Sequence, residues 1–93
     1  MSEVTVRDNT EAHHWEAVVD NEVAGFAQYE LDGDTITFVH TEVDPAYGGQ
    51  GIGTALITAS LDDARRRGRT VVPLCPFYAH FFKEREEYAD LLG

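Results

Sequence analysis

The order of secondary structure in this chain is decided by one stretch, TEVDPAYGGQGIGTAL at residues 41–56. A β-branched run ends at a proline turn, and a glycine-rich loop leads into a segment rich in alanine and leucine. Glycines permit positive φ angles and close backbone approach. The start of a helix leaves backbone N–H groups unpaired and carries partial positive charge. The stretch therefore predicts a strand, a loop and a helix that together form a cradle for a phosphate or pyrophosphate.

The residues before this stretch predict an antiparallel meander. Apolar and polar residues alternate around 4–6, and β-rich runs follow at 15–19, 23–29 and 35–43. Asp20-Asn21 and Asp32-Gly33-Asp34 separate the last three runs, and these residue types favour hairpin turns. Three to four antiparallel strands are therefore expected in the first half of the chain.

The residues after the loop change to a helical period. An apolar stripe runs through 51–67, where Asp63 and Arg67 have the i,i+4 spacing of a helical ion pair. Gly68 is a natural stop, 70–74 reads as a short strand, and Pro76 to about Arg85 reads as a second helix. A strand–helix–strand unit usually pairs its strands in parallel. The expected fold class is α+β: an antiparallel β-meander, then a β-α-β crossover and a C-terminal helix, in a single domain spanning 1–93.

Composition narrows the function classes. The 93 residues contain 17 acidic side chains against 7 Lys and Arg, so the formal net charge is −10 and nonspecific binding to nucleic acid or anionic lipid is disfavoured. Two interpretations of the acidity remain open: attraction of a cationic substrate, or a solvated surface adapted to high salt. We expect no membrane span and, from Met1 to Val4, no signal peptide. The single cysteine, Cys75, excludes an internal disulfide and fits a reducing cytoplasm.

Two familiar phosphate loops do not match the glycine-rich segment. A P-loop ends in Gly-Lys-Ser/Thr, which this chain lacks, and the dinucleotide fingerprint needs a glycine where Thr54 stands. The segment instead resembles the acyl-CoA signature of the GNAT acetyltransferase superfamily, Arg/Gln-x-x-Gly-x-Gly/Ala. The combination of 40–43, the loop and helix at 48–56, and Val-Val-Pro-Leu-Cys-Pro-Phe at 71–77 is most similar to its very small YjdJ-type members. The resemblance covers the chain from about residue 13 onward.

The resemblance implies an acetyl-CoA site between the strand ending at Val43 and the strand ending at Leu74. The residues that would bind acetyl-CoA or coenzyme A are Thr41, Val43, Gly48, Gly49, Gln50, Gly51, Ile52, Gly53, Thr54, Pro76, Phe77 and Tyr78. The implied activity is transfer of the acetyl group to an amine, either a small amine or a protein lysine. Two departures bear on this activity: Gly48 stands where Arg or Gln is usual, and Phe81-Phe82 occupy the region of the family's usual tyrosine acid.

Three residues are candidates for the chemistry. Cys75 precedes a helix start, which lowers a thiol pKa and favours a nucleophile, although most free cysteines are small buried hydrophobes. His40 and Glu42 lie two apart on one strand, so they share a face, and either one is a candidate base or proton relay. The alternative is a hydrogen-bonded histidine and a polar edge glutamate. No ligand spacing among these residues supports a metal site.

Two other functions remain open. One is a CoA or acyl-CoA binding module without useful catalysis, which both departures favour. The other is an accessory domain that acts through a protein partner, with a vestigial cleft. An exposed edge strand in so small a sheet allows either a monomer or a weak homodimer.

Overall fold

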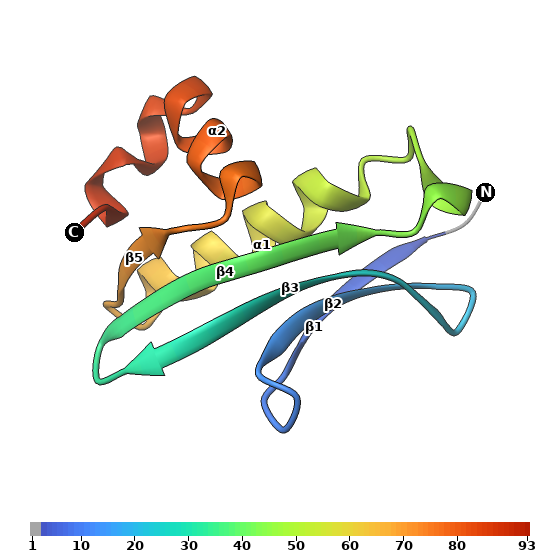
Figure 1. Cartoon of the computed structure of the whole chain (residues 1–93), viewed down its shortest axis with the longest axis horizontal. Coiled ribbons are helices and arrows are strands. Elements are labelled where there is room, and N and C mark those ends of the chain that lie inside the picture. The colour runs from blue at the N-terminus through green and yellow to red at the C-terminus, as the bar shows by residue number, and fades with distance from the viewer. Residues whose placement is uncertain (1–2) are drawn as a thin grey trace.

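The computed structural model describes residues 3–93. Met1 and Ser2, two of the residues on which the signal-peptide prediction depends, lie outside the described part. One five-stranded sheet with the order β1-β2-β3-β4-β5 forms the centre of the molecule (Figure 1). Neighbouring strands are antiparallel from β1 to β4, and β4 and β5 are parallel. The strands are β1 (Val4–Asn9), β2 (His14–Val19), β3 (Glu22–Asp32), β4 (Thr35–Val43) and β5 (Thr70–Pro73). The predicted meander and crossover are confirmed.

Helices fill the positions that the periodicity predicts. A short 3₁₀ helix, η1 (Pro45–Tyr47), precedes the loop, and α1 (Ile52–Arg66) forms the crossover between β4 and β5. Helix α2 (Pro76–Glu84) and a second 3₁₀ helix, η2 (Glu86–Leu91), close the chain. Figure 1 shows α1 running alongside the sheet, with α2 and η2 gathered near the C-terminal end of the fold.

The two predicted hairpin turns adopt the backbone conformations that their residues favour. Asp20 and Asn21 both have positive φ, 51° and 67°, and join β2 to β3. Gly33, with φ of 60°, lies in the turn between β3 and β4. Asn and Asp tolerate this left-handed region better than most residues with a side chain, so the local sequence specifies both turns.

The two faces of the sheet differ in what covers them. One face carries buried residues such as Ala27, Ile36 and Phe38, and α1 packs across all five strands on it. The other face carries Phe26, which is half-buried, and His40 and Glu42, which are exposed. Among residues 3–93 no helix covers this second face, which we call the open face.

Helix α2 is anchored to the covered face by one aromatic stack. The rings of Phe38 and Tyr78 are nearly parallel, with centroids 4.1 Å apart. The Tyr78 hydroxyl lies 2.7 Å from Ser60 Oγ on α1, and Ser60 donates to the Ile57 carbonyl at 3.0 Å. A buried hydroxyl needs such a partner, so this pair of hydroxyls fixes α2 against both the sheet and α1.

Strands β4 and β5 separate halfway along β4. Their pairing runs from Thr35 opposite Thr70 to Phe38 opposite Pro73, and the Cys75 N–H makes a last bond to the Phe38 carbonyl at 2.9 Å. Across the other edge of β4, Gln28 pairs with His40 and Tyr29 with Phe38, so the residue between them, Val39, forms a bulge. The free part of β4, Val39–Val43, therefore begins where a bulge bends the strand.

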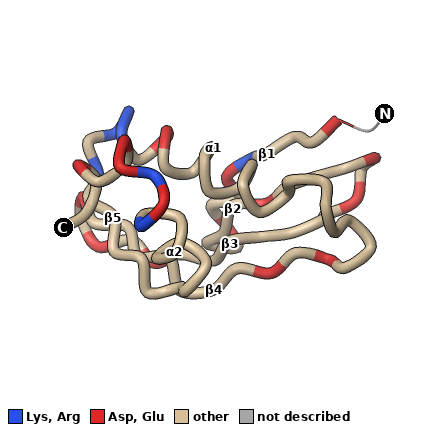
Figure 2. The backbone as a smooth tube through the Cα atoms, turned by 90° about the horizontal axis from the view of Figure 1, so that it is seen from above, with Lys and Arg blue, Asp and Glu red and all other residues tan. Residues whose placement is uncertain are grey.

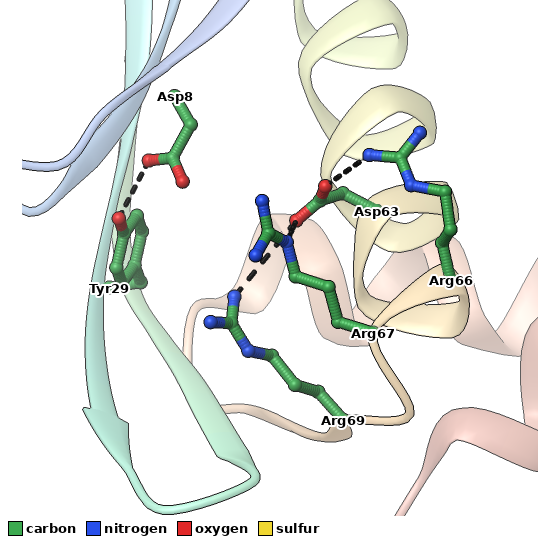
Figure 3. A network of polar contacts seen from close by, with 6 residues as sticks. All are labelled: Asp8, Tyr29, Asp63, Arg66, Arg67 and Arg69. Atoms are coloured by element: carbon green, nitrogen blue, oxygen red, sulfur yellow. Dashed lines mark hydrogen bonds and ion pairs between the residues drawn. The ribbon is translucent and has the colours of Figure 1, made fainter.

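Basic residues gather at one end of the molecule. In Figure 2 most blue segments lie near the C-terminus, whereas red segments spread along the chain; Arg7 lies apart from the other basic residues, on β1. Asp63, almost fully buried, receives Arg67 Nε at 2.9 Å and lies 3.9 Å from Arg69 Nη1, and it also pairs with Arg66 (Figure 3). The predicted Asp63–Arg67 pair is thus one part of a cluster that ties the end of α1 to β5.

Candidate functional site

The glycine-rich loop presents the start of α1 with unpaired donors. Gly51 caps the helix with φ of 74°, and Gly49 has φ of 79°. The first helical bond runs from the Ala55 N–H to the Gly51 carbonyl at 2.9 Å. The amides of the three residues that precede Ala55 in α1, Ile52, Gly53 and Thr54, therefore have no partner within the helix.

Not every loop amide is available to an anion. The Gly48 N–H donates to the Pro45 carbonyl at 3.1 Å, and the Gln50 N–H to the Tyr47 carbonyl at 3.3 Å. These bonds belong to the turn that follows η1, so both amides serve the loop itself. The geometry leaves the candidate donors at Gly49, at Gly51 and in the first turn of α1.

The free half of β4 lies beside the thiol of Cys75. This cysteine is the N-cap of α2, with extended φ and ψ of −67° and 126°, and it is only 4% exposed. Its Sγ donates to Thr41 Oγ1 at 3.3 Å. The structure thus brings together two residues of the predicted site that are distant in the sequence, at the point where β4 and β5 separate.

The other two candidate catalytic residues lie on the opposite face. His40 Nε2 is 3.6 Å from Glu42 Oε1, so the two residues share a face as their spacing predicts. Their side chains are 55% and 63% exposed and lie on the open face. Strand β4 therefore separates the Cys75 thiol and Thr41 on one face from the His40 imidazole and the Glu42 carboxylate on the other.

The three residues predicted to contact the cofactor from α2 have different surroundings. Pro76 is exposed at the first turn of the helix. The Phe77 ring is 42% exposed and lies against Gly53 of the loop. Tyr78 has no exposed surface, and burial raises its pKa well above the ordinary value while the hydrogen bond between Tyr78 and Ser60 lowers it in part. In this structure Tyr78 belongs to the core and does not line a cleft.

A surface cavity of about 450 Å³ lies between the start of β3 and the end of β4. Val23, Phe26, Glu42 and Asp44 are among its lining residues. Glu42 and the adjacent Val43 were singled out from the sequence, but Val23, Phe26 and Asp44 were not. Local patterns place Val23 and Phe26 in a strand and Asp44 in a turn, and only the pairing of β3 with β4 brings them together.

Two further classes of site find no support in the described residues. No helix between residues 3 and 93 is long and apolar enough to cross a membrane. The same part of the chain holds no group of His, Cys, Asp and Glu side chains arranged to bind a metal ion.

A parallel strand pair that opens beside a glycine-rich helix start defines a GNAT-like fold. A sequence model described as GCN5-related N-acetyl-transferase matches residues 14–91, which is most of the chain. The chain belongs to this family, so its general class is that of an acetyltransferase. A search among curated proteins found no sequence match.

Solved structures show the same fold. The chain is similar to a GCN5-like protein from Staphylococcus aureus, with a TM-score of 0.76, 24% identity, and coverage of 100% of this chain and 91% of the other. It is also similar to a ribosomal-protein-alanine N-acetyltransferase from Brucella melitensis, with a TM-score of 0.63, 18% identity, and coverage of 99% and 91%. The ribosomal-protein-S18-alanine N-acetyltransferase of Escherichia coli is similar with a TM-score of 0.62 and 19% identity, and the match covers 76% of this chain and 64% of the other.

Proposed function

We propose that this chain binds acetyl-CoA and transfers the acetyl group to an amine. The observation that carries the proposal is the free edge of β4 from Val39 to Val43, beside the loop that leads into α1. An extended, amide-containing chain can pair with such an edge as an added strand. The unpaired amides at the start of α1 suit a pyrophosphate. One ligand that contains both features, an amide-linked arm and a pyrophosphate, is coenzyme A.

The proposed chemistry uses both faces of β4. An ammonium acceptor loses its proton to Glu42 or His40 on the open face, and its nitrogen then attacks the thioester carbonyl carbon. The new N–C bond forms, the C–S bond breaks, and the leaving CoA thiolate takes up the second proton that the nitrogen releases. Holding the amine against the thioester supplies effective concentration, and a backbone N–H near Val43 is a candidate donor to the developing oxyanion.

Cys75 offers a second route to the same products. Its thiolate attacks the thioester carbonyl, the acetyl group moves to Sγ, and CoA leaves as the thiolate. The amine then attacks acetyl-Cys75 and regenerates the thiolate. The contact of Sγ with Thr41 Oγ1 at 3.3 Å supports this route, because it holds the sulfur at the end of the free edge. A reducing cytoplasm would keep the thiol in the form that this step needs.

One observation favours the alternative of a CoA-binding module without turnover. The only tyrosine near the start of α2, Tyr78, is sealed in the core by Phe38 and Ser60. It therefore offers no proton to a leaving thiolate in this conformation. Gly48 adds to this argument, because no long polar side chain stands at that loop position.

Calorimetric titration with acetyl-CoA tests the binding step, and absence of binding at millimolar concentration would contradict both functions. Intact-protein mass after incubation with acetyl-CoA tests the cysteine route, since acetyl-Cys75 is heavier by one acetyl group. Cys75→Ala removes that adduct, whereas Cys75→Ser keeps a hydroxyl near Thr41 as a matched control. If Cys75→Ala retained full amine acetylation, direct transfer would be the route. Binding without any acetylated amine would support the module.

A further inference from the structure

We infer that the acceptor is a short aliphatic diamine, held in the cavity between the start of β3 and the end of β4. This inference rests on the proposed function, because it names the acceptor for that transfer. The cavity, of about 450 Å³, lies where Glu42 of the open face meets the turn into η1. Its lining combines apolar side chains with two carboxylates, those of Glu42 and Asp44.

The apolar part of the cavity suits a chain of methylene groups. Val23 is 48% exposed although it is a large apolar residue, and Pro45, the first residue of η1, lines the same cavity. Phe26 stands in register with Glu42 on β4 and with Glu16 on β2. The ring also lies near the rings of His14 and His40. Glu16 is buried and accepts from Asn9 Nδ2 at 2.9 Å. The aromatic face together with the Glu42 carboxylate attracts an alkylammonium group. The wall thus favours an aliphatic cation over a neutral or anionic ligand.

The charged part of the cavity carries two negative groups. Among the described residues that line it, only Glu42 and Asp44 have titratable side chains. They are two residues apart on extended backbone, which separates their Cα atoms by about 7 Å. Two ammonium groups on a short carbon chain span a similar distance. A monoamine would satisfy only one of the two carboxylates.

The surroundings strengthen the negative potential. Tyr47 of η1 donates to Glu22 Oε2 at 3.0 Å. This hydrogen bond to Glu22 is the main cause that raises the pKa of Tyr47, and burial and the charges of Glu22, Asp44 and Asp20 add to the rise. Carboxylates from β3 and from the segment after β4 therefore act on the same small region. His40 Nε2 lies 3.6 Å from Glu42 Oε1, and its ring centroid is 6.1 Å from that of Phe26.

The two ends of the diamine have different roles. Glu42 belongs to the free edge of β4, Val39–Val43, along which the arm of acetyl-CoA is proposed to pair, so the Glu42 end is the one nearer the proposed acetyl group. The ammonium at Glu42 gives one proton to that carboxylate, and its nitrogen forms the new N–C bond as the C–S bond of the thioester breaks. The leaving CoA thiolate takes the second proton. The ammonium at Asp44 keeps its proton and positions the chain. Only the first nitrogen is acetylated.

The kinetic experiment compares 1,4-diaminobutane with butylamine, which differ by one terminal ammonium group. We expect kcat/KM for the diamine to be at least about tenfold higher, equivalent to about 1.4 kcal/mol. The ratio of the two kcat/KM values should fall to near one in Asp44→Asn, because the amide removes the negative charge. Asparagine still offers an oxygen to the Ala46 N–H, which Asp44 Oδ1 accepts at 2.9 Å in the wild type. Asp32→Asn, at the opposite end of β3, is the control and should keep the ratio.

A binding experiment separates this inference from the proposed function. Protein NMR titration with 1,4-diaminobutane alone should shift Phe26 and Val23 amides in the wild type and in Asp32→Asn, and much less in Asp44→Asn. Shifts without any acetyl transfer would support the diamine site and contradict the transferase. Equal kcat/KM for both amines would overturn the diamine site and leave the transferase standing. An absence of shifts at saturating diamine would also overturn it.

Discussion

The Phe77 ring lies directly against Gly53, so closely that a Cβ added at Gly53 would stand 2.3 Å from Phe77 Cζ. Gly53 is in the first turn of α1, and Phe77 is in the first turn of α2. The contact joins the two helix starts that flank the proposed acetyl-CoA site. Glycine at position 53 is therefore required by close approach rather than by backbone conformation.

A double-mutant cycle tests this contact. In the Phe77→Ala background, Gly53→Ala should stabilise the protein by about 0.5–1 kcal/mol, because alanine favours the helix and no ring opposes it. In the wild type the ring must move, so the gain should shrink or reverse, with a coupling energy of at least about 0.5 kcal/mol. Urea denaturation measures all four proteins. Gly68→Ala is the control for a glycine that is needed for its backbone conformation. It should lower the free energy of unfolding, because Gly68 has φ of 69°.

The buried hydroxyl of Tyr78 should matter for stability and not for chemistry. Tyr78→Phe removes the contact with Ser60 and should lower the free energy of unfolding by about 0.5–1.5 kcal/mol. Affinity for acetyl-CoA and the rate of acetyl transfer should stay within a factor of about two, about 0.4 kcal/mol. Tyr88→Phe loses only an exposed contact with Asp62 and serves as the control. Tenfold weaker binding in Tyr78→Phe would restore Tyr78 to the site.

Stability should fall at alkaline pH. Burial and the hydrogen bond to Asp8 raise the pKa of Tyr29, and burial raises that of Tyr78, both above the ordinary value of 10.0. Above pH 10 the unfolded chain loses phenol protons that the folded chain keeps, so each tyrosine costs up to about 1.4 kcal/mol per pH unit. Below pH 10 neither residue should contribute a slope. Urea denaturation between about pH 9 and 11 measures this slope. The free energy of unfolding should fall less steeply with pH in the double variant Tyr29→Phe/Tyr78→Phe than in the wild type.

The carboxylate of Asp63 should stabilise the end of α1. Asp63→Asn leaves three arginines with a weaker acceptor and should cost about 1–3 kcal/mol, at the low end because Arg66 and Arg67 keep contact with water. Asp62→Asn changes an exposed neighbour and should stay within about 0.5 kcal/mol of the wild type. Thermal unfolding compares the two variants. Equal losses would show that Asp63 acts only through net charge.

Added salt should strengthen acetyl-CoA binding and weaken diamine binding. The chain carries a net charge of −10 and acetyl-CoA is anionic, so screening removes repulsion. Between about 0.1 M and 1 M salt the Debye length falls from about 10 Å to about 3 Å. Calorimetric titration at both concentrations gives the sign for each ligand. Weaker acetyl-CoA binding in high salt would show instead that arginines near the C-terminal end contact the cofactor.

Local patterns in the sequence were sufficient for the order of the elements. The turn at Asp20-Asn21, the glycine-rich start of α1 and the proline at the start of α2 each depend on the conformations of a few adjacent residues. Such preferences act within one turn or one strand, so they can be read without the rest of the fold. The same is true of the shared face of His40 and Glu42.

The partners of individual side chains depended on contacts between distant segments. Tyr78 had the same sequence-based role as Phe77, yet Phe38 and Ser60 draw its ring into the core while Phe77 stays at the surface. Neighbouring residues on a helix point in directions about 100° apart. Which direction is buried depends on where the sheet and α1 lie, and no local pattern contains that information.

Residue types and their spacing were therefore enough to define a meander, a crossover helix and an anion-binding loop. Tertiary structure alone placed Cys75 beside Thr41, which is 34 residues away, and Phe26 opposite Glu42. The second pairing follows from the register of β3 and β4, and a shift by one residue would turn its side chains to the other face. The first depends on where the chain leaves β5 and begins α2. The arrangement of the proposed site on the two faces of β4 therefore depends on the assembled sheet.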